Sequence, residues 1–144
     1  MDETQVDWST QAKGDSLPEM TRGPITQEML KSYAKASGDE NPIHLDPEAA
    51  KQMGLPGVIA HGMLSMGFMG DYAAQLAGDL KRVKSLKCQF KSMTFLGDLL
   101  TLCGSFKEIE IKEQGQNLAI CQIQVKNQKG EITCQGEARI QVDL

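Results

Sequence analysis

The sequence predicts an α+β domain in which an antiparallel sheet packs on helices. Two observations support this fold class. The first half of the chain, to about residue 78, carries helix caps and helical patterns, whereas the second half consists of segments in which apolar and polar residues alternate, as they do in half-buried strands. Clusters of glycine, asparagine and aspartate separate these segments, so we expect consecutive hairpins after the helices.

The first helix is expected to begin after Thr26 and to end at Gly38. Thr26 can cap the free backbone N–H groups of the first turn, and Ile25 can pack against Leu30 across that turn. Glycine favours the left-handed backbone that commonly ends a helix, so Gly38 marks the C-terminus.

Two further helices follow. Pro42 prevents regular helix in residues 39–45, which leaves a loop, and Asp46 begins a short second helix that ends near Gly54. A longer segment, residues 61–78, is apolar nearly all the way round rather than along one stripe. We therefore expect this helix to be buried and to lie in the concave face of the sheet.

Several segments have the pattern of strands. In the best defined of them, Leu86, Cys88 and Phe90 alternate with polar residues. The last strand carries an unbroken series of inward positions that ends at Val142. We expect strands at about residues 17–23, 86–90, 99–111, 118–125 and 131–142.

Composition and charge restrict the class of protein. The 144 residues include 15 Lys plus Arg against 19 Asp plus Glu, for a net charge of −4, which disfavours a nucleic-acid or anionic-membrane partner. The longest mainly apolar stretch, residues 58–68, falls short of the roughly 20 residues that a bilayer span needs. The acidic start lacks the features of a secretory signal. We expect a cytoplasmic protein with one domain at residues 16–144, preceded by a tail or arm at residues 1–15.

The four cysteines indicate neither a metal site nor a disulfide framework. They are spaced 15, 18 and 13 residues apart, and no two of them form a CxxC pair. This spacing disfavours zinc and is typical of small core residues in a reducing compartment.

The first candidate site is the loop after the first helix. Asp39 and His44 bracket residues 40–43, and Gly38 and Pro42 limit the freedom of this loop. Held in this way, an aspartate and a histidine can share the activation of one water molecule. Helix capping or simple solvation is the alternative for such residues in a polar loop.

The second candidate site is the start of the long apolar helix, at His61 and Gly62. Helix N-termini carry unpaired N–H groups and a partial positive charge, so the N–H of Gly62 can hold a carbonyl oxygen on which negative charge builds. Close packing beneath a sheet is the alternative reason for a glycine here. For His61 the alternative is a hydrogen-bonded structural imidazole.

Together the two sites resemble a known family. The run SGDENPIH, the LDPEAA that follows it and the later IAHGM segment are similar to the hydratase motif of the MaoC-like (R)-specific enoyl-CoA hydratases and their 3-hydroxyacyl-thioester dehydratase relatives. The order and offsets of the motifs agree with that family across about residues 17–142. Such a combination would rarely arise by chance.

The resemblance implies a hot-dog fold, in which an antiparallel sheet wraps around a long helix and two copies pair into one continuous sheet. We therefore expect a homodimer. It also implies that Asp39 and His44 are the catalytic pair and that the backbone N–H of Gly62 binds the thioester oxygen. Asn41 lies inside the motif and is expected to brace the loop or the water.

The chain departs from the family's pattern at one position. In some hydratases a serine about two turns into the helix steadies the catalytic aspartate. That offset falls on Gly70 here, and Ser65 lies elsewhere on the helix. The departure favours the dehydratase branch of the family.

Further residues are candidates for contact with the substrate. Asn41 and His61 flank the expected reaction centre, and Met63 and Met66 belong to a methionine stripe that either lines an acyl pocket or fills the core. A basic cluster after the helix has two interpretations, namely contact with the phosphates of CoA or an acidic carrier protein, or a solvated strand face. It consists of Lys81, Arg82, Lys84, Lys87 and Lys91.

The activity that the resemblance implies is the reversible hydration of trans-2-enoyl thioesters to (3R)-hydroxyacyl thioesters, with an enoyl-CoA or an enoyl-acyl-carrier-protein as substrate. We expect no cofactor and no metal, because the thioester itself polarises the double bond. The alternatives are a non-catalytic hot-dog partner subunit that binds acyl thioesters, and a hot-dog acyl-CoA thioesterase. A nucleotide-binding oxidoreductase is excluded, since the chain contains neither a GxGxxG turn nor a GxxxxGK[ST] loop.

Overall fold

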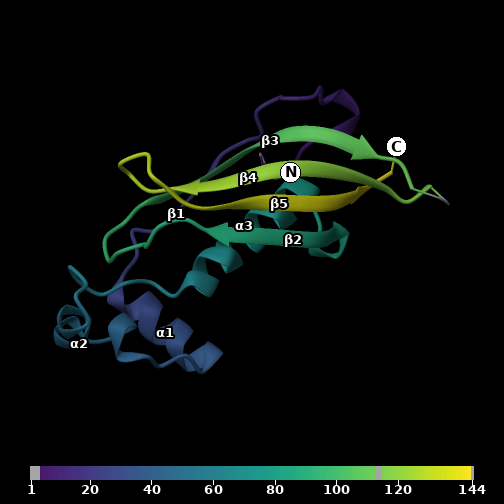
Figure 1. The fold of residues 1–144 in the computed structure, drawn as a ribbon. Coiled ribbons are helices and arrows are strands. Elements are labelled where there is room, and N and C mark those ends of the chain that lie inside the picture. Colours follow the sequence, from purple (N-terminus) through teal and green to yellow (C-terminus); the bar gives the residue numbers. More distant parts are fainter. Residues whose placement is uncertain (1–3, 113–114, 144) are drawn as a thin grey trace.

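The computed structural model describes residues 4–112 and 115–143, and within these ranges five strands form one antiparallel sheet (Figure 1). The order across the sheet is β1-β3-β4-β5-β2, so β1 and β2 are its edge strands. The bounds are Met20–Arg22 for β1, Val83–Phe90 for β2, Leu100–Glu110 for β3, Asn117–Lys126 for β4 and Ile132–Val142 for β5. The predicted α+β class is confirmed.

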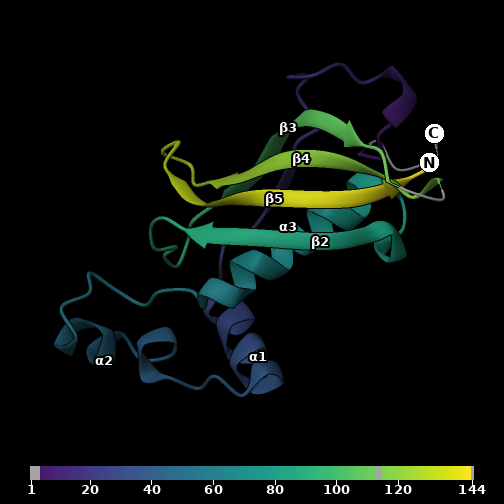
Figure 2. The same cartoon turned by 45° about the vertical axis from the view of Figure 1, so that its right-hand side comes forward.

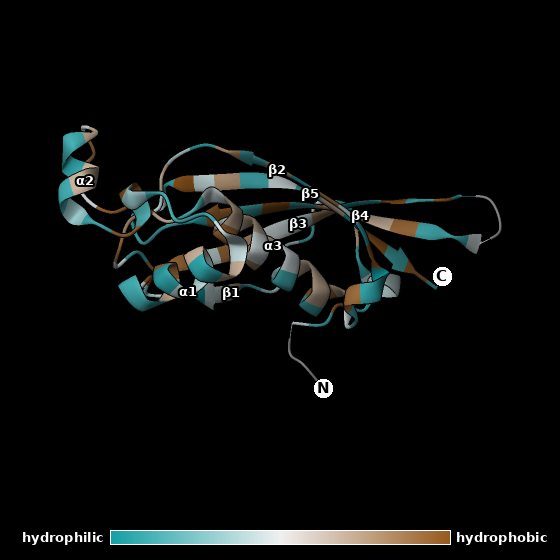
Figure 3. Cartoon of the chain, turned by 90° about the horizontal axis from the view of Figure 1, so that it is seen from below, coloured by the Kyte–Doolittle hydropathy of each residue, from teal (hydrophilic) through white to brown (hydrophobic). Residues whose placement is uncertain are grey.

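The helices lie on one side of this sheet (Figures 1 and 2). They are α1 (Gln27–Ser37), α2 (Pro47–Gln52) and the long α3 (Gly62–Ala77). Short 3₁₀ turns cover Trp8–Thr10, Pro42–His44 and Leu80–Arg82. Seen from below, α1 and α3 run in front of the sheet while α2 stands apart from it (Figure 3).

The ends of α1 follow from its capping residues. The Thr26 side chain accepts a hydrogen bond from the Met29 N–H, which satisfies one of the free donors of the first turn. Gly38 has a φ of 80°, a left-handed conformation that glycine adopts without steric cost, and its N–H bonds the Ala34 carbonyl. Both predicted boundaries are confirmed, and together they fix the point at which the Asp39 loop begins.

Two glycines let neighbouring strands of the sheet approach each other closely. Gly104, Ile123 and Gly136 lie opposite one another on β3, β4 and β5. A Cβ at Gly136 would collide with the Lys87 carbonyl oxygen, and one at Gly104 would collide with the Gln122 carbonyl oxygen. The neighbouring backbones therefore approach more closely than any other residue would allow. The core between helix and sheet includes Met69, Tyr72, Ala73, Leu76, Ile123, Ala138 and Ile140.

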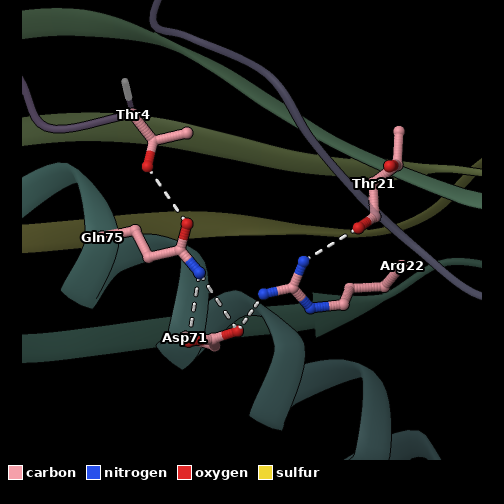
Figure 4. A network of polar contacts seen from close by, with 5 residues as sticks. All are labelled: Thr4, Thr21, Arg22, Asp71 and Gln75. Atoms are coloured by element: carbon pink, nitrogen blue, oxygen red, sulfur yellow. Dashed lines mark hydrogen bonds and ion pairs between the residues drawn. The ribbon is translucent and has the colours of Figure 1, made fainter. Parts of the chain in front are cut away.

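The expectation that α3 is buried all round is wrong. One face packs on the sheet, but Met63 is 57% exposed, and Gly67 and Asp71 are also exposed. The sheet covers one side of the helix, which leaves the opposite side to polar contacts. There Asp71 pairs with Arg22 of β1, and Gln75 accepts a hydrogen bond from Thr4 (Figure 4).

The N-terminal arm is packed against the far end of α3. The Val6 N–H bonds the Leu76 carbonyl at 3.0 Å, and the buried Trp8 ring lies 6.1 Å from the Phe106 ring between centroids. Further along, the Gly14 N–H bonds the Phe106 carbonyl. The arm thus connects the C-terminal end of α3 to β3.

The cysteines are free thiols, and two of them belong to the core as expected. Cys121 and Cys134 are buried, and burial raises the pKa of each thiol to about 12. Cys88 and Cys103 are half-buried, with thiol pKa values that burial also raises. These thiols are therefore poor nucleophiles at neutral pH.

A search of residues 4–112 and 115–143 for helices that could span a bilayer finds none with the necessary length and apolar character.

Replacing Gly136 tests the close approach of β2 and β5. Gly136→Ala is expected to lower the free energy of unfolding by about 1–3 kcal/mol, the usual cost of overpacking. The matched control is Gly67→Ala, because Gly67 lies within α3 and a Cβ there meets no atom within 4 Å. This control should raise stability by up to about 1 kcal/mol. Urea denaturation measures both, and equal stability of the two variants would contradict the interpretation.

Candidate active site

The loop between α1 and α2 is held by its own side chains. Asp39 Oδ1 accepts a hydrogen bond from the Asn41 N–H at 3.3 Å, and Asn41 Oδ1 accepts one from the Ile43 N–H at 3.2 Å. Residues Pro42–His44 form a single 3₁₀ turn, which the His44 N–H closes on the Asn41 carbonyl. Asn41 therefore braces the loop, one of the two roles expected for it.

The loop brings the carboxylate of Asp39 and the imidazole of His44 face to face. Asp39 Oδ2 lies 3.9 Å from His44 Nε2, too far for a direct hydrogen bond. One water oxygen can lie within hydrogen-bond distance of both atoms. The Asp39 side chain is 53% exposed and that of His44 is 9% exposed, so solvent reaches the pair from the side of the carboxylate.

A backbone contact fixes the tautomer of His44. Its Nδ1 lies 2.7 Å from the Ile59 carbonyl oxygen, and because a carbonyl can accept but not donate, Nδ1 carries the proton. In the neutral ring the lone pair is then on Nε2, the atom that faces Asp39. His44 is thus oriented as a proton acceptor toward the shared water position.

His61 supports both members of this pair. Its Nε2 lies 2.9 Å from the Asp39 carbonyl oxygen and donates a hydrogen bond to it, while its ring stacks on His44 at 3.9 Å between centroids. Tyr33 of α1 meets the His61 ring edge-on at 4.8 Å. Among the described residues, His61 Nδ1 is buried without a hydrogen-bond partner. This side chain therefore connects α1, the Asp39 loop and the start of α3.

A cavity of about 540 Å³ opens beside these residues. It lies between the start of α3, the end of β2 and the segment that follows β2. The lining residues include His44, Ile59, Ala60, His61, Gly62, Ser65, Phe90, Lys91, Ser92, Met93, Thr94 and Thr133. The cavity thus reaches both the imidazole of His44 and the first residue of α3.

Gly62 occupies the position expected for an oxyanion donor. It is the first residue of α3, where a backbone N–H has no partner within the helix, and the His61 side chain does not cap it. A Cβ at position 62 would lie 3.4 Å from the Phe90 ring. Any side chain larger than glycine would therefore narrow the space between α3 and Phe90.

Other candidates lie away from the cavity. Met63 and Met66 do not line it, since Met63 points to the exposed side of α3 and Met66 is half-buried. A Cβ at Gly70 would face Leu86 of β2 at 3.8 Å, so that position is directed toward the sheet edge. Of the basic cluster, Lys91 lines the cavity, whereas Arg82 pairs with Asp143.

The three titratable groups do not suit a metal ion. Ligand atoms of Asp39, His44 and His61 lie within 4.8 Å of one another. However, His61 already donates its Nε2 proton to a backbone carbonyl, which leaves only its Nδ1 lone pair, and the planes of the two stacked rings differ by only 25°. Zinc binds an imidazole nitrogen at about 2.0–2.1 Å, in line with its lone pair, so one ion cannot meet both rings.

Sequence reasoning missed the opposite wall of the cavity and the supports of the histidines. Tyr33, Thr94 and Thr133 gave no signal of their own, because tertiary packing brings them to the site. The Ile59 carbonyl, which orients His44, is a backbone group that no side-chain motif identifies. The periodic spacing of α1 could have placed Tyr33 on the face toward the site.

Comparison with known proteins places these motifs in context. The model of the MaoC like domain matches residues 9–128. The chain is 37% identical to the mitochondrial 3-hydroxyacyl-acyl-carrier-protein dehydratase of Arabidopsis thaliana over 101 residues. This alignment covers 69% of this chain and 57% of that protein. It is 43% identical to the alpha subunit of a 3-oxo-4,17-pregnadiene-20-carboxyl-CoA hydratase of Mycobacterium tuberculosis over 49 residues. That alignment covers 34% of this chain and 16% of the other protein. The chain thus spans 57% or less of the relatives that match it first.

Solved structures agree with the fold. R-hydratase PhaJ1 from Pseudomonas aeruginosa superposes with a TM-score of 0.80 at 28% sequence identity, covering 94% of this chain and 84% of that one. The (R)-hydratase of A. caviae gives a TM-score of 0.78 at 22% identity, covering 92% and 98% of the two chains. The hot-dog arrangement of sheet and helix is thereby confirmed.

Removing the donor of His61 tests its support of the loop. His61→Phe keeps a ring between His44 and Tyr33 but loses the hydrogen bond to the Asp39 carbonyl. Since one such bond contributes about 1 kcal/mol, the amides of residues 39–41 and 43–45 should exchange with solvent about fivefold faster. Hydrogen-exchange mass spectrometry measures this. Amides of residues 72–77 serve as the internal reference, and unchanged exchange in the loop would refute the role.

Proposed function

The chain belongs to the MaoC-like domain family, and from this premise we propose that it catalyses the reversible hydration of trans-2-enoyl thioesters to (3R)-hydroxyacyl thioesters. The family includes enzymes named as 3-hydroxyacyl dehydratases and enoyl-CoA hydratases, which act in the two directions of this reaction. Water addition to a conjugated thioester is nearly balanced, so the direction depends on the supply of substrate.

One observation carries the proposal: the imidazole of His44 and the N-terminus of α3 meet at one cavity, and the carboxylate of Asp39 lies beside the Nε2 atom of that imidazole. Asp39 Oδ2 is 3.9 Å from His44 Nε2, and both His44 and Gly62 line the cavity. These are an acid–base pair and a hydrogen-bond donor, the two kinds of group that the addition of water to an enoyl thioester requires.

In the proposed first step, the thioester oxygen accepts a hydrogen bond from the Gly62 N–H. This contact and the partial positive charge of the α3 N-terminus draw electrons from the double bond toward the oxygen. The β-carbon becomes electrophilic. The thioester supplies the conjugation, so the step needs no metal or redox cofactor.

Water bound between Asp39 and His44 then attacks the β-carbon. One member of the pair accepts the water proton as the new C–O bond forms, and the electron pair of the double bond moves to the thioester oxygen. The same proton returns to the α-carbon when the enolate collapses. Dehydration follows these steps in reverse, with the same groups.

The carrier of the acyl group and the assembly of the protein belong to the same proposal. Lys91 at the cavity gives an anionic carrier, either CoA or an acyl carrier protein, a cationic partner. We expect two copies to pair through the open edge of β2, which ends at the half-exposed Phe90. A homodimer rather than a heterodimer would appear as a single species of twice the chain mass in analytical ultracentrifugation.

The test of function uses the purified chain with crotonyl-CoA and longer trans-2-enoyl-CoA substrates. Loss of the enoyl absorbance with formation of the (3R)-alcohol, identified by chiral analysis, is the expected result. Release of free thiol would indicate a thioesterase instead. Binding without turnover would indicate a non-catalytic partner subunit.

Replacing Asp39 by asparagine tests the acid–base pair. Asp39→Asn retains the shape of the loop but removes the carboxylate, so kcat should fall by about 10²–10⁴-fold, the usual contribution of general acid–base catalysis.

Asp46→Asn is the matched control for this substitution. Asp46 caps α2 by accepting from the Glu48 N–H, and asparagine caps equally well, so turnover should be unchanged. Steady-state hydration kinetics measure both variants, with circular dichroism as the check on folding. Near-normal hydration by Asp39→Asn would overturn the assignment.

A further inference from the structure

Ser65 is a buried hydroxyl inside an otherwise apolar helical segment. It is the one serine or threonine of α3, it is 5% exposed and it lines the cavity. Among the described residues, no group accepts or donates a hydrogen bond to its side chain, whereas Thr133 in the same wall bonds the Val125 carbonyl. The hydroxyl oxygen is in contact with the cavity and is not sealed in the core, so a group that enters the cavity can accept its hydrogen bond.

Helix geometry puts Ser65 next to the N–H of Gly62. Residues three apart are neighbours on one helix face, and side chains lean toward the N-terminus of their helix. The Ser65 side chain therefore leans from the second turn of α3 toward the level of Gly62. The usual alternative partner for a helical serine is the carbonyl four residues earlier. That carbonyl belongs to His61, and within the described residues it accepts from the Leu64 N–H without a bond from the Ser65 hydroxyl.

We propose that the Ser65 hydroxyl donates a second hydrogen bond to the thioester oxygen held by the Gly62 N–H. This inference rests on the proposed function and goes beyond it by naming a second donor. Two donors from one helix face would surround the oxygen as it becomes negatively charged, and the hydroxyl can rotate to follow the shorter contact in the transition state. Ser65 thus stabilises the enolate and leaves the acid–base pair untouched.

The kinetic test compares Ser65→Ala with the unmodified chain on crotonyl-CoA. Loss of one donor to a developing oxyanion should lower kcat by about 10²-fold. KM should change little, because the bond strengthens mainly in the transition state. Ser32→Ala is the matched control, since Ser32 is an exposed serine within α1. Its kcat should equal that of the unmodified chain.

A spectroscopic test separates polarisation of the carbonyl from a merely structural role. In an Asp39→Asn background, which blocks turnover, bound 2,4-hexadienoyl-CoA should absorb at longer wavelength than the free compound, because donors at the oxygen polarise the conjugated system. Adding Ser65→Ala should remove part of this red shift. The midpoint temperature of thermal unfolding should be unchanged or higher in the Ser65→Ala variants, since alanine favours helix.

The outcomes distinguish this inference from the proposed function. If the unmodified chain hydrates enoyl-CoA and Ser65→Ala matches it in kcat and red shift, the role of Ser65 is refuted while the function stands. A slow Ser65→Ala variant that keeps the full red shift also refutes the second donor. If the unmodified chain neither hydrates enoyl-CoA nor shifts the spectrum of the probe, the proposed function itself fails.

Discussion

The site depends on two imidazole N–H groups that each donate to a backbone carbonyl. His44, in the loop after α1, donates to the Ile59 carbonyl at 2.7 Å. His61, at the start of α3, donates to the Asp39 carbonyl of that loop at 2.9 Å. The loop and the segment before α3 are therefore joined by two hydrogen bonds. The two imidazole rings also stack on each other, with 3.9 Å between their centroids. A short polar loop would otherwise be free to move away from the helix that carries Gly62. Because these bonds use backbone acceptors, they also fix the tautomer of His44 without a second carboxylate.

The rest of the fold supplies a rigid frame for that connection. The long helix α3 is anchored at its C-terminal half, where Tyr72, Ala73 and Leu76 are fully buried against the sheet. Its N-terminal turn lies beside the loop and the cavity, where free backbone N–H groups can donate hydrogen bonds to a ligand. At Gly104 and Gly136 the backbones of neighbouring strands lie too close for any side chain, which keeps the sheet beside the helix tightly packed. Rigidity at one end of α3 is thus combined with accessible donors at the other.

The sequence anticipated what local chemistry determines. Thr26 and Gly38 gave the bounds of α1, and the period-two pattern around Cys88 gave β2, because caps and alternation act over a few residues. It failed for α3, since apolar residues on all sides do not reveal that a single sheet covers one face and leaves Met63 exposed. The pairing of Asp39 with His44 followed from the loop and the family motif. The wall carrying Thr94 comes from a segment about 50 residues later, and only tertiary packing brings it there.

Under the proposed mechanism, a neutral hydrogen-bond donor at the thioester oxygen suits the energetics of the reaction. Hydration and dehydration of a β-carbon are nearly balanced, so an enzyme gains nothing from holding one ground state more tightly than the other. A fixed cation at the thioester oxygen would bind both ground states strongly and contribute less to the rate. A backbone N–H at a helix terminus binds weakly until charge develops on the oxygen, and only then does its dipole contribute fully. In that mechanism, the donor at Gly62 and the orientation of His44 Nε2 suit a transition state that carries its negative charge only briefly.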